Sequence, residues 1–70
     1  MSNKIQQVLP VKWIQHLTNL PETGMGYQMV DVYLNDGKIL RSKEIINSSI
    51  INLDENINLD NIISIKLIKI

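Results

Sequence analysis

The chain contains no cysteine, no phenylalanine and no alanine, and each absence narrows what it can be. Without cysteine it forms no disulfides and no thiolate metal sites. Its single histidine cannot build a histidine-based metal cage, so we expect neither a bound metal nor a cofactor. Alanine is the best helix former, whereas the thirteen isoleucines favour strands, so the composition predicts a β-rich protein.

An excess of charge of either sign is also missing, because seven basic side chains balance seven acidic ones. A neutral chain has no long-range field that attracts nucleic acid or an anionic membrane surface. The sequence has no apolar run as long as a membrane helix, and residues 1–7 lack the apolar core of a secretory signal. We therefore expect a cytoplasmic protein with no membrane partner.

The length allows one small domain, residues 1–70. A chain this short buries only ~60% of the surface that its unfolded form exposes, so such domains usually rely on disulfides, a metal or a partner subunit. Because the first two are excluded, we expect a homo-oligomer, and a further protein partner is compatible with this expectation.

Residues 27–41 predict a β-hairpin. In its first half, apolar and more polar side chains alternate with the period of two that is typical of a half-buried strand. Asp36 and Gly37 then predict a type I′ turn, which would place Ile39 opposite Leu34 on the same face.

The segments around the hairpin are short. Residues 11–20 carry an apolar side chain at every third position between Pro10 and Pro21, which predicts a short amphipathic helix; in a competing interpretation a strand at 5–9 precedes it. Further strands are expected at residues 45–46, 50–53 and 63–67, separated by turns at 47–49 and 54–56 and a helical turn at 59–62. The predicted fold class is mainly β: four to five antiparallel strands in a small barrel or strongly bent sheet with one short N-terminal helix.

The same patterns predict which side chains fill the interior. Closing or bending the sheet would hide strand edges that an isoleucine-rich chain otherwise exposes to aggregation. The expected core residues are Trp13, Leu17, Val30, Val32, Leu34, Ile39, Ile51, Leu53, Ile63, Ile65 and Leu67.

A candidate binding surface lies on the first strand of the hairpin, where Tyr27, Met29, Asp31 and Tyr33 share one predicted face. Two tyrosines along a strand are suited to stacking on bases, whereas in the alternative this face is covered by the helix around Trp13. Basic side chains follow the hairpin turn, where they either contact nucleic acid or keep a strand edge from aggregating. The candidate binding residues are Tyr27, Tyr33, Lys38, Arg41 and Lys43.

No motif indicates catalysis. Residues 20–24 match the LPxTG motif that sortases cut, but a hairpin follows them instead of a membrane segment, so we interpret them as a helix end and a turn. His16 is a candidate general base, yet the nearest nucleophile, Thr18, points elsewhere on a helix. We expect no catalytic residues and a protein that is not an enzyme.

Residues 30–39, with their strand, Asp-Gly turn and returning strand, resemble the central hairpin of small five-stranded barrels, including the Sm-like RNA-binding proteins. Residues 59–65 are similar to the helical turn and closing strand of such barrels. The resemblance spans residues 27–68 and implies a barrel-like fold and RNA binding. Residues 23–28 are also similar to small bacterial proteins without an assigned activity. Two functions follow as predictions: a self-associating, non-enzymatic interaction module, or a nucleic-acid-binding module of Sm-like type.

Overall fold

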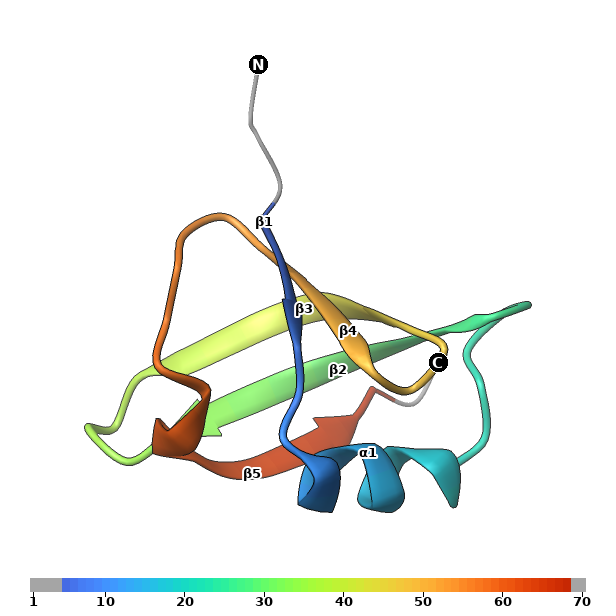
Figure 1. The fold of residues 1–70 in the computed structure, drawn as a ribbon, viewed down its shortest axis with the longest axis horizontal. Helices are drawn as coiled ribbons and strands as arrows, with labels where there is room; N and C mark the ends of the chain where they lie inside the picture. Colours follow the sequence, from blue (N-terminus) through green and yellow to red (C-terminus); the bar gives the residue numbers. More distant parts are fainter. Residues whose placement is uncertain (1–4, 69–70) are drawn as a thin grey trace.

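The computed structural model describes residues 5–68. In chain order its elements are β1 (Ile5–Val8), α1 (Val11–Thr18), β2 (Tyr27–Leu34), β3 (Ile39–Ile46), β4 (Ile50–Leu53), the 3-10 helix η1 (Leu59–Asn61) and β5 (Ile62–Leu67). The strands form one antiparallel sheet in the order β1-β4-β3-β2-β5 (Figure 1). The prediction of a mainly β domain with one short helix is confirmed, and a strand does precede the helix.

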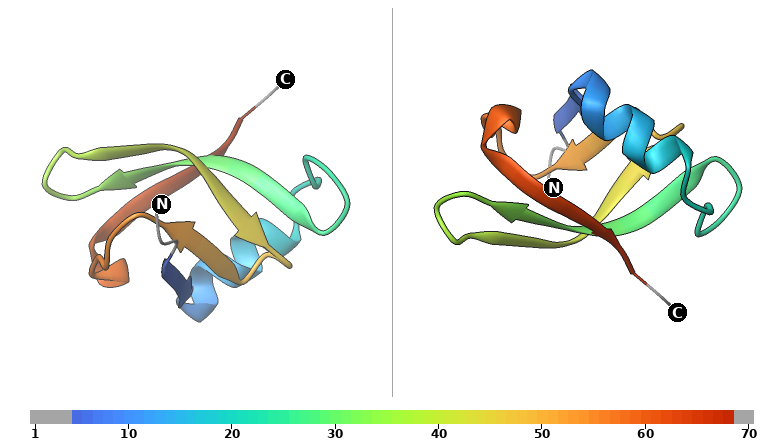
Figure 2. Two further views of the ribbon diagram at one scale, coloured as in Figure 1. Left: turned by 90° about the horizontal axis from the view of Figure 1, so that it is seen from above. Right: turned by 90° about the horizontal axis from the view of Figure 1, so that it is seen from below.

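The sheet is strongly bent but open, with β1 at one edge and β5 at the other, so the bent sheet is the correct alternative and the closed barrel is not. α1 lies on the inner side of the bend (Figure 2), where its Leu17 joins the core. The helix begins after Pro10, whose carbonyl accepts hydrogen bonds from the N–H groups of Trp13 (2.9 Å) and Ile14 (3.1 Å). The core therefore fills the space between α1 and the concave side of the sheet.

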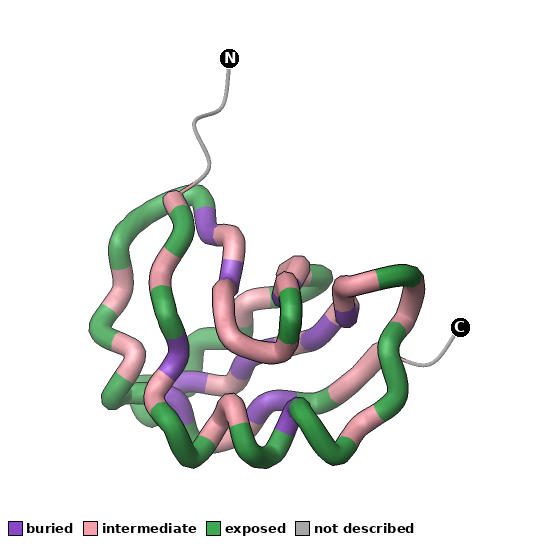
Figure 3. Tube along the Cα trace, turned by 45° about the vertical axis from the view of Figure 1, so that its right-hand side comes forward, coloured by how far each residue is buried: buried purple, intermediate pink, exposed green. Residues whose placement is uncertain are grey.

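The core contains most of the residues that the sequence pattern predicts. Figure 3 shows buried positions alternating with more exposed ones along the chain. Trp13 and Leu67 are half-buried and pack against it, whereas Ile39 and Ile63 are exposed, so those two predictions were wrong. Both errors have the same kind of cause, a change of strand register. The buried apolar side chains are Leu9, Leu17, Val30, Val32, Leu34, Ile45, Ile51, Leu53, Ile62 and Ile65.

The turn between β2 and β3 is not the predicted type I′ turn. Gly37 has a positive φ of 90°, whereas Asp36 does not adopt the left-handed conformation. Ile39 pairs with Tyr33 instead of Leu34, which lengthens the loop by one residue. A register shift of one residue moves a side chain to the opposite face of a sheet. Ile39 therefore lies on the solvent side.

A bulge in β5 explains the second error. The register between β2 and β5 shifts between Tyr33 and Leu34, because β5 contains an extra residue at Ile63. The bulge turns Ile62 into the core and leaves Ile63 62% exposed. A bulge interrupts the alternation of inward and outward side chains, so a strict period of two fails at this position.

A second bulge lies in β3, opposite Asp31, where the pairing with β2 shifts by one residue. Ser42 occupies the bulge with a φ of 56°, a left-handed conformation that is unfavourable for residues other than glycine. Its N–H donates a hydrogen bond of 2.9 Å to Oδ1 of Asp31. The Asp31 carboxylate therefore holds the bulge in place from the neighbouring strand.

Gln28 is the only polar residue that is fully buried in the described part of the chain, with 1% of its surface exposed. Its Nε2 donates to the carbonyl of Leu17 at 3.0 Å and lies 3.3 Å from those of Leu20 and Pro21. These carbonyls lie at and just beyond the C-terminal end of α1, where backbone acceptors have no partner within the helix. The Gln28 amide therefore fastens the end of the helix to the beginning of β2.

Candidate interaction surface

β2 divides its side chains between the core and the solvent. Tyr27, Met29, Asp31 and Tyr33 are half-buried and alternate with buried residues, as predicted. We call the side of the sheet that faces away from the core the outer face. Because α1 and Trp13 pack on the inner side, the helix does not cover these residues, and the expected alternative of burial beneath the helix is wrong.

Four apolar side chains form a row across the outer face, which we call the apolar row. Directly paired residues of neighbouring antiparallel strands point to the same side of the sheet. Tyr27 pairs with Ile46, Ile46 with Ile50, and Ile50 with Val8, so the row crosses β2, β3, β4 and β1. Val8 is 68% exposed, and the other three are partly exposed.

The rest of the outer face mixes charged and apolar residues. Glu44 pairs with Met29 and accepts a hydrogen bond of 2.7 Å from Nδ2 of Asn52. Asp31 pairs with Lys66 on its other side. Beyond these charges, Tyr33 and Ile39 form a second apolar pair at the far end of β2 and β3. The outer face is therefore apolar at both ends of these strands and charged in the middle.

Each predicted basic residue lies beside a carboxylate. Ion pairs at the protein surface contribute about 0–1 kcal/mol to stability, but they reduce the local positive potential. The N···O distances are 3.2 Å for Lys38 and Glu55, 3.7 Å for Arg41 and Asp31, and 3.2 Å for Lys43 and Asp54.

The five predicted binding residues do not form one surface. The two tyrosines and Arg41 share the outer face, whereas Lys38 and Lys43 pair with carboxylates of the loop after β4. Lys66, which the sequence reasoning missed, places its Nζ 5.5 Å from the centre of the Tyr33 ring. Its outward position in the alternation of β5 was the available signal.

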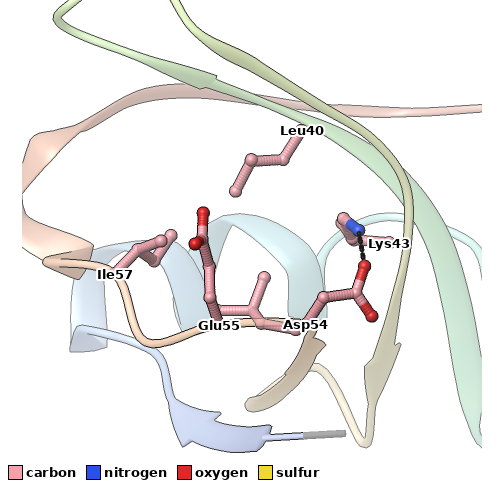
Figure 4. A pocket seen from close by; sticks show the side chains of 6 residues that line it. Leu40, Lys43, Asp54, Glu55 and Ile57 are labelled. Atoms are coloured by element: carbon pink, nitrogen blue, oxygen red, sulfur yellow. Dashed lines mark hydrogen bonds and ion pairs between the residues drawn. The ribbon is translucent and has the colours of Figure 1, made fainter. Parts of the chain in front are cut away.

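Lys43 borders a pocket of about 160 Å³ between β3 and the loop after β4 (Figure 4). The pocket is lined by Leu40, Lys43, Leu53, Asp54, Glu55 and Ile57. Binding sites for small molecules are usually larger, roughly 300–1,000 Å³. The pocket has room for a few waters or one apolar side chain.

The LPxTG segment is folded back against β2. Oγ1 of Thr23 accepts a hydrogen bond of 2.9 Å from the N–H of Met29, and the Tyr27 carbonyl accepts the N–H groups of Thr23 (3.0 Å) and Gly24 (3.2 Å). A Cβ atom at Gly24 would collide with the ring of Tyr27. The segment thus ends the helical region and turns the chain, as predicted. Its Gly24 lies against the ring of Tyr27.

His16 and Thr18 do not form a catalytic pair. The His16 Nε2 lies 3.3 Å from the carbonyl oxygen of Ile65 at the free edge of β5, and Thr18 donates its hydroxyl to the carbonyl of Ile14 at 2.6 Å. Residues 5–68 contain no group of three or more potential metal ligands. No helix within the same residues has the length and apolar character needed to cross a membrane.

Comparison with known proteins gave no relative: the chain matches no protein-family model, no curated protein and no solved structure. Function must therefore be inferred from the geometry of this surface. Its main features are the apolar row, the second apolar pair, and the balanced charges between them.

Proposed function

We propose that this protein is a non-enzymatic interaction module that self-associates through the outer face of its sheet. The apolar row carries the proposal, because contiguous apolar side chains on a solvent-facing surface are typical of interaction sites. The balance of seven basic and seven acidic residues supports it as well. A chain without net charge meets no long-range repulsion from a second copy.

The two sheet edges are less suited to association than the outer face. Within residues 5–68, β1 has four residues, and a short edge strand offers few backbone groups for pairing. β5 is interrupted by the bulge at Ile63. On the unpaired side of β5, the His16 ring contacts the Ile65 carbonyl oxygen. Both features protect an edge against addition of a strand.

Nucleic-acid binding is the alternative, and the outer face supports it less well. A site for phosphates needs unpaired cations, which displace the counterions of the nucleic acid on binding. Lys38, Arg41 and Lys43 each lie beside a carboxylate instead. Two features support the proposed resemblance to Sm-like barrels: η1 directly precedes β5, and β5 pairs with β2. β1, which precedes the helix, is not part of that resemblance.

We also propose a cytoplasmic location. Small domains of secreted proteins commonly depend on disulfides, and this chain has no cysteine.

Sedimentation equilibrium over a range of micromolar to millimolar concentrations tests the proposal. We expect the mass to rise from that of a monomer towards that of an oligomer. Ile46→Lys, which places a charge in the apolar row, should shift the equilibrium towards monomer. Val11→Lys is the control, because Val11 is 67% exposed and lies on α1, away from the outer face. A wild-type protein that stays monomeric throughout would refute self-association, and tight binding of single-stranded RNA at low salt would favour the alternative.

A further inference from the structure

The outer face of β2 and β3 has an approximate twofold pattern centred on the paired residues Val30 and Lys43. On β2, Met29 and Asp31 lie one residue from the centre, and Tyr27 and Tyr33 lie three residues from it. Tyrosines therefore stand at equal distances on either side of the centre.

β3 follows the same pattern once its bulge is taken into account. On one side of the centre lie Glu44 and then Ile46. On the other side, after the extra residue of the bulge, lie Arg41 and then Ile39. An acid thus stands opposite a base, and an isoleucine opposite an isoleucine, at matching distances from the centre.

We infer that two copies of the chain pack outer face to outer face around a twofold axis that crosses the strands at Val30. This operation exchanges the two ends of each strand. Tyr27 of one copy then meets Tyr33 of the other, Ile46 meets Ile39, and Glu44 meets Arg41. Every contact occurs twice, as an interface with twofold symmetry requires.

The charges identify a second copy as the occupant of this face. Glu44 bonds to Asn52, and no cation within residues 5–68 forms an ion pair with it. The Arg41 side chain is 68% exposed and only 3.7 Å from Asp31, so it can approach a second carboxylate. In the dimer, Arg41 of one copy lies between Asp31 of its own chain and Glu44 of the other.

In the remaining contact within β2, Met29 against Asp31, the carboxylate is not left without a partner. Oδ1 of Asp31 accepts the N–H of Ser42, and Oδ2 faces Arg41. The Asp31 carboxylate is already partnered inside its own chain, so an apolar neighbour costs little.

The curvature of the outer face bears on the strength of the dimer. A standard interface takes roughly 800 Å² from each partner, about a sixth of the 4668 Å² of accessible surface of the chain. The sheet bends around the core, so its outer face is convex and contact is centred on β2 and β3 (Figure 2). Two convex faces touch over a limited area, so we expect a reversible dimer.

The inference rests on the proposed self-association, and charge reversal separates the two. Glu44→Lys would place a lysine opposite Arg41 at both contacts, and Arg41→Glu would place a glutamate opposite Glu44. Each variant alone should weaken the dimer about tenfold, since like charges at two contacts cost roughly 1.4 kcal/mol together. Circular dichroism verifies that each variant keeps its fold.

An equimolar mixture of the two variants is the decisive sample. In the mixed dimer both contacts between positions 41 and 44 again join an acid to a base, so native mass spectrometry should show heterodimers well above the statistical share. If the wild type dimerises but the mixture shows no preference for heterodimers, the arrangement is wrong while self-association stands. If the wild type is monomeric at millimolar concentration, both are wrong.

Cysteine cross-linking gives a second readout that does not depend on charge. In one chain Ile39 and Ile46 lie at opposite ends of β3, roughly 20 Å apart at ~3.3 Å per residue, too far for a disulfide within the chain. The double variant Ile39→Cys with Ile46→Cys should therefore oxidise to a covalent dimer much faster than either single variant. Equal rates for the double and single variants would contradict the proposed axis.

Discussion

Replacing Gln28 tests how this small domain holds its helix against its sheet. Gln28→Leu keeps the approximate volume of the side chain but removes the donor that serves the carbonyls of Leu17, Leu20 and Pro21. The Leu17 carbonyl keeps the N–H of Leu20 at 3.0 Å, whereas the carbonyls of Leu20 and Pro21 lose this donor. A buried acceptor without a partner costs about 1–3 kcal/mol. A domain of this length has a total stability of roughly 3.5–10 kcal/mol, so the loss is a large fraction of it.

Urea unfolding, followed through the single tryptophan, Trp13, measures this loss. With a denaturant slope of about 1 kcal/mol per molar urea, the midpoint should fall by roughly 1–3 M. Gln15→Leu is the matched control, because Gln15 is exposed on α1 and its side chain makes no hydrogen bond within residues 5–68. If Gln28→Leu is as stable as the wild type, the amide does not fasten the helix as we describe.

The nearly isosteric change Gln28→Glu should make the free energy of unfolding depend on pH, in a direction that the burial of this position determines. Burial disfavours the charged carboxylate, so the pKa of the introduced carboxyl should be higher in the folded than in the unfolded protein. The variant should therefore be most stable below the unfolded pKa, near 4.3, and lose stability as the pH rises through the folded pKa. If the urea midpoint of Gln28→Glu, relative to that of the wild type, does not decrease as the pH is raised from acidic to neutral, this position is hydrated.

Two further substitutions test the other local features. Ser42→Gly should preserve or raise stability by up to about 1 kcal/mol because glycine accepts the positive φ of the bulge, whereas the β-branched Ser42→Val should lower it by about 1–2 kcal/mol; thermal unfolding that ranks valine above glycine would contradict the left-handed geometry. Gln7→Ala removes the Nε2 bond to the carbonyl of Ile57 (3.1 Å) and the acceptor for its N–H (3.2 Å), and should cost about 1–3 kcal/mol in urea unfolding. No change in stability there would mean that the loop after β4 is held by other contacts.

The sequence predicts the class of the fold well, because alternation along β2 is regular. Positions 30, 32 and 34 are all buried as the period of two requires. The same alternation extends to Gln28, which is buried although it is polar. Its position in this alternation was the available signal. Its partner carbonyls lie at and just beyond the end of α1, and their approach to Gln28 depends on tertiary packing.

Register is the part that local patterns do not determine. Ile39 and Ile63 are exposed because a longer turn and a bulge each shift the pairing by one residue. The positive φ angles of Asn47 (52°) and Ser48 (61°) place a left-handed turn between β3 and β4, whereas the sequence favoured one at Asp36 and Gly37. Asparagine tolerates this conformation better than most residues, so the signal at Asn47 was present but weaker than Asp-Gly.

The candidate site shows a similar division. The shared face of Tyr27 and Tyr33 follows from alternation within one strand. The carboxylate beside each of the three predicted basic residues does not follow from alternation, because two of these carboxylates belong to the loop after β4. Only the folded chain shows that an apparently basic edge is electrostatically balanced and that the apolar row crosses four strands.

Amide chemical shifts recorded by NMR during a dilution series test most directly whether the outer face joins two copies. We predict that the largest concentration-dependent changes fall on β2 and β3, at positions such as Tyr27, Tyr33 and Ile46, while α1 around Leu17 stays constant. Shifts that do not change with concentration, or that change chiefly on α1, would contradict the account.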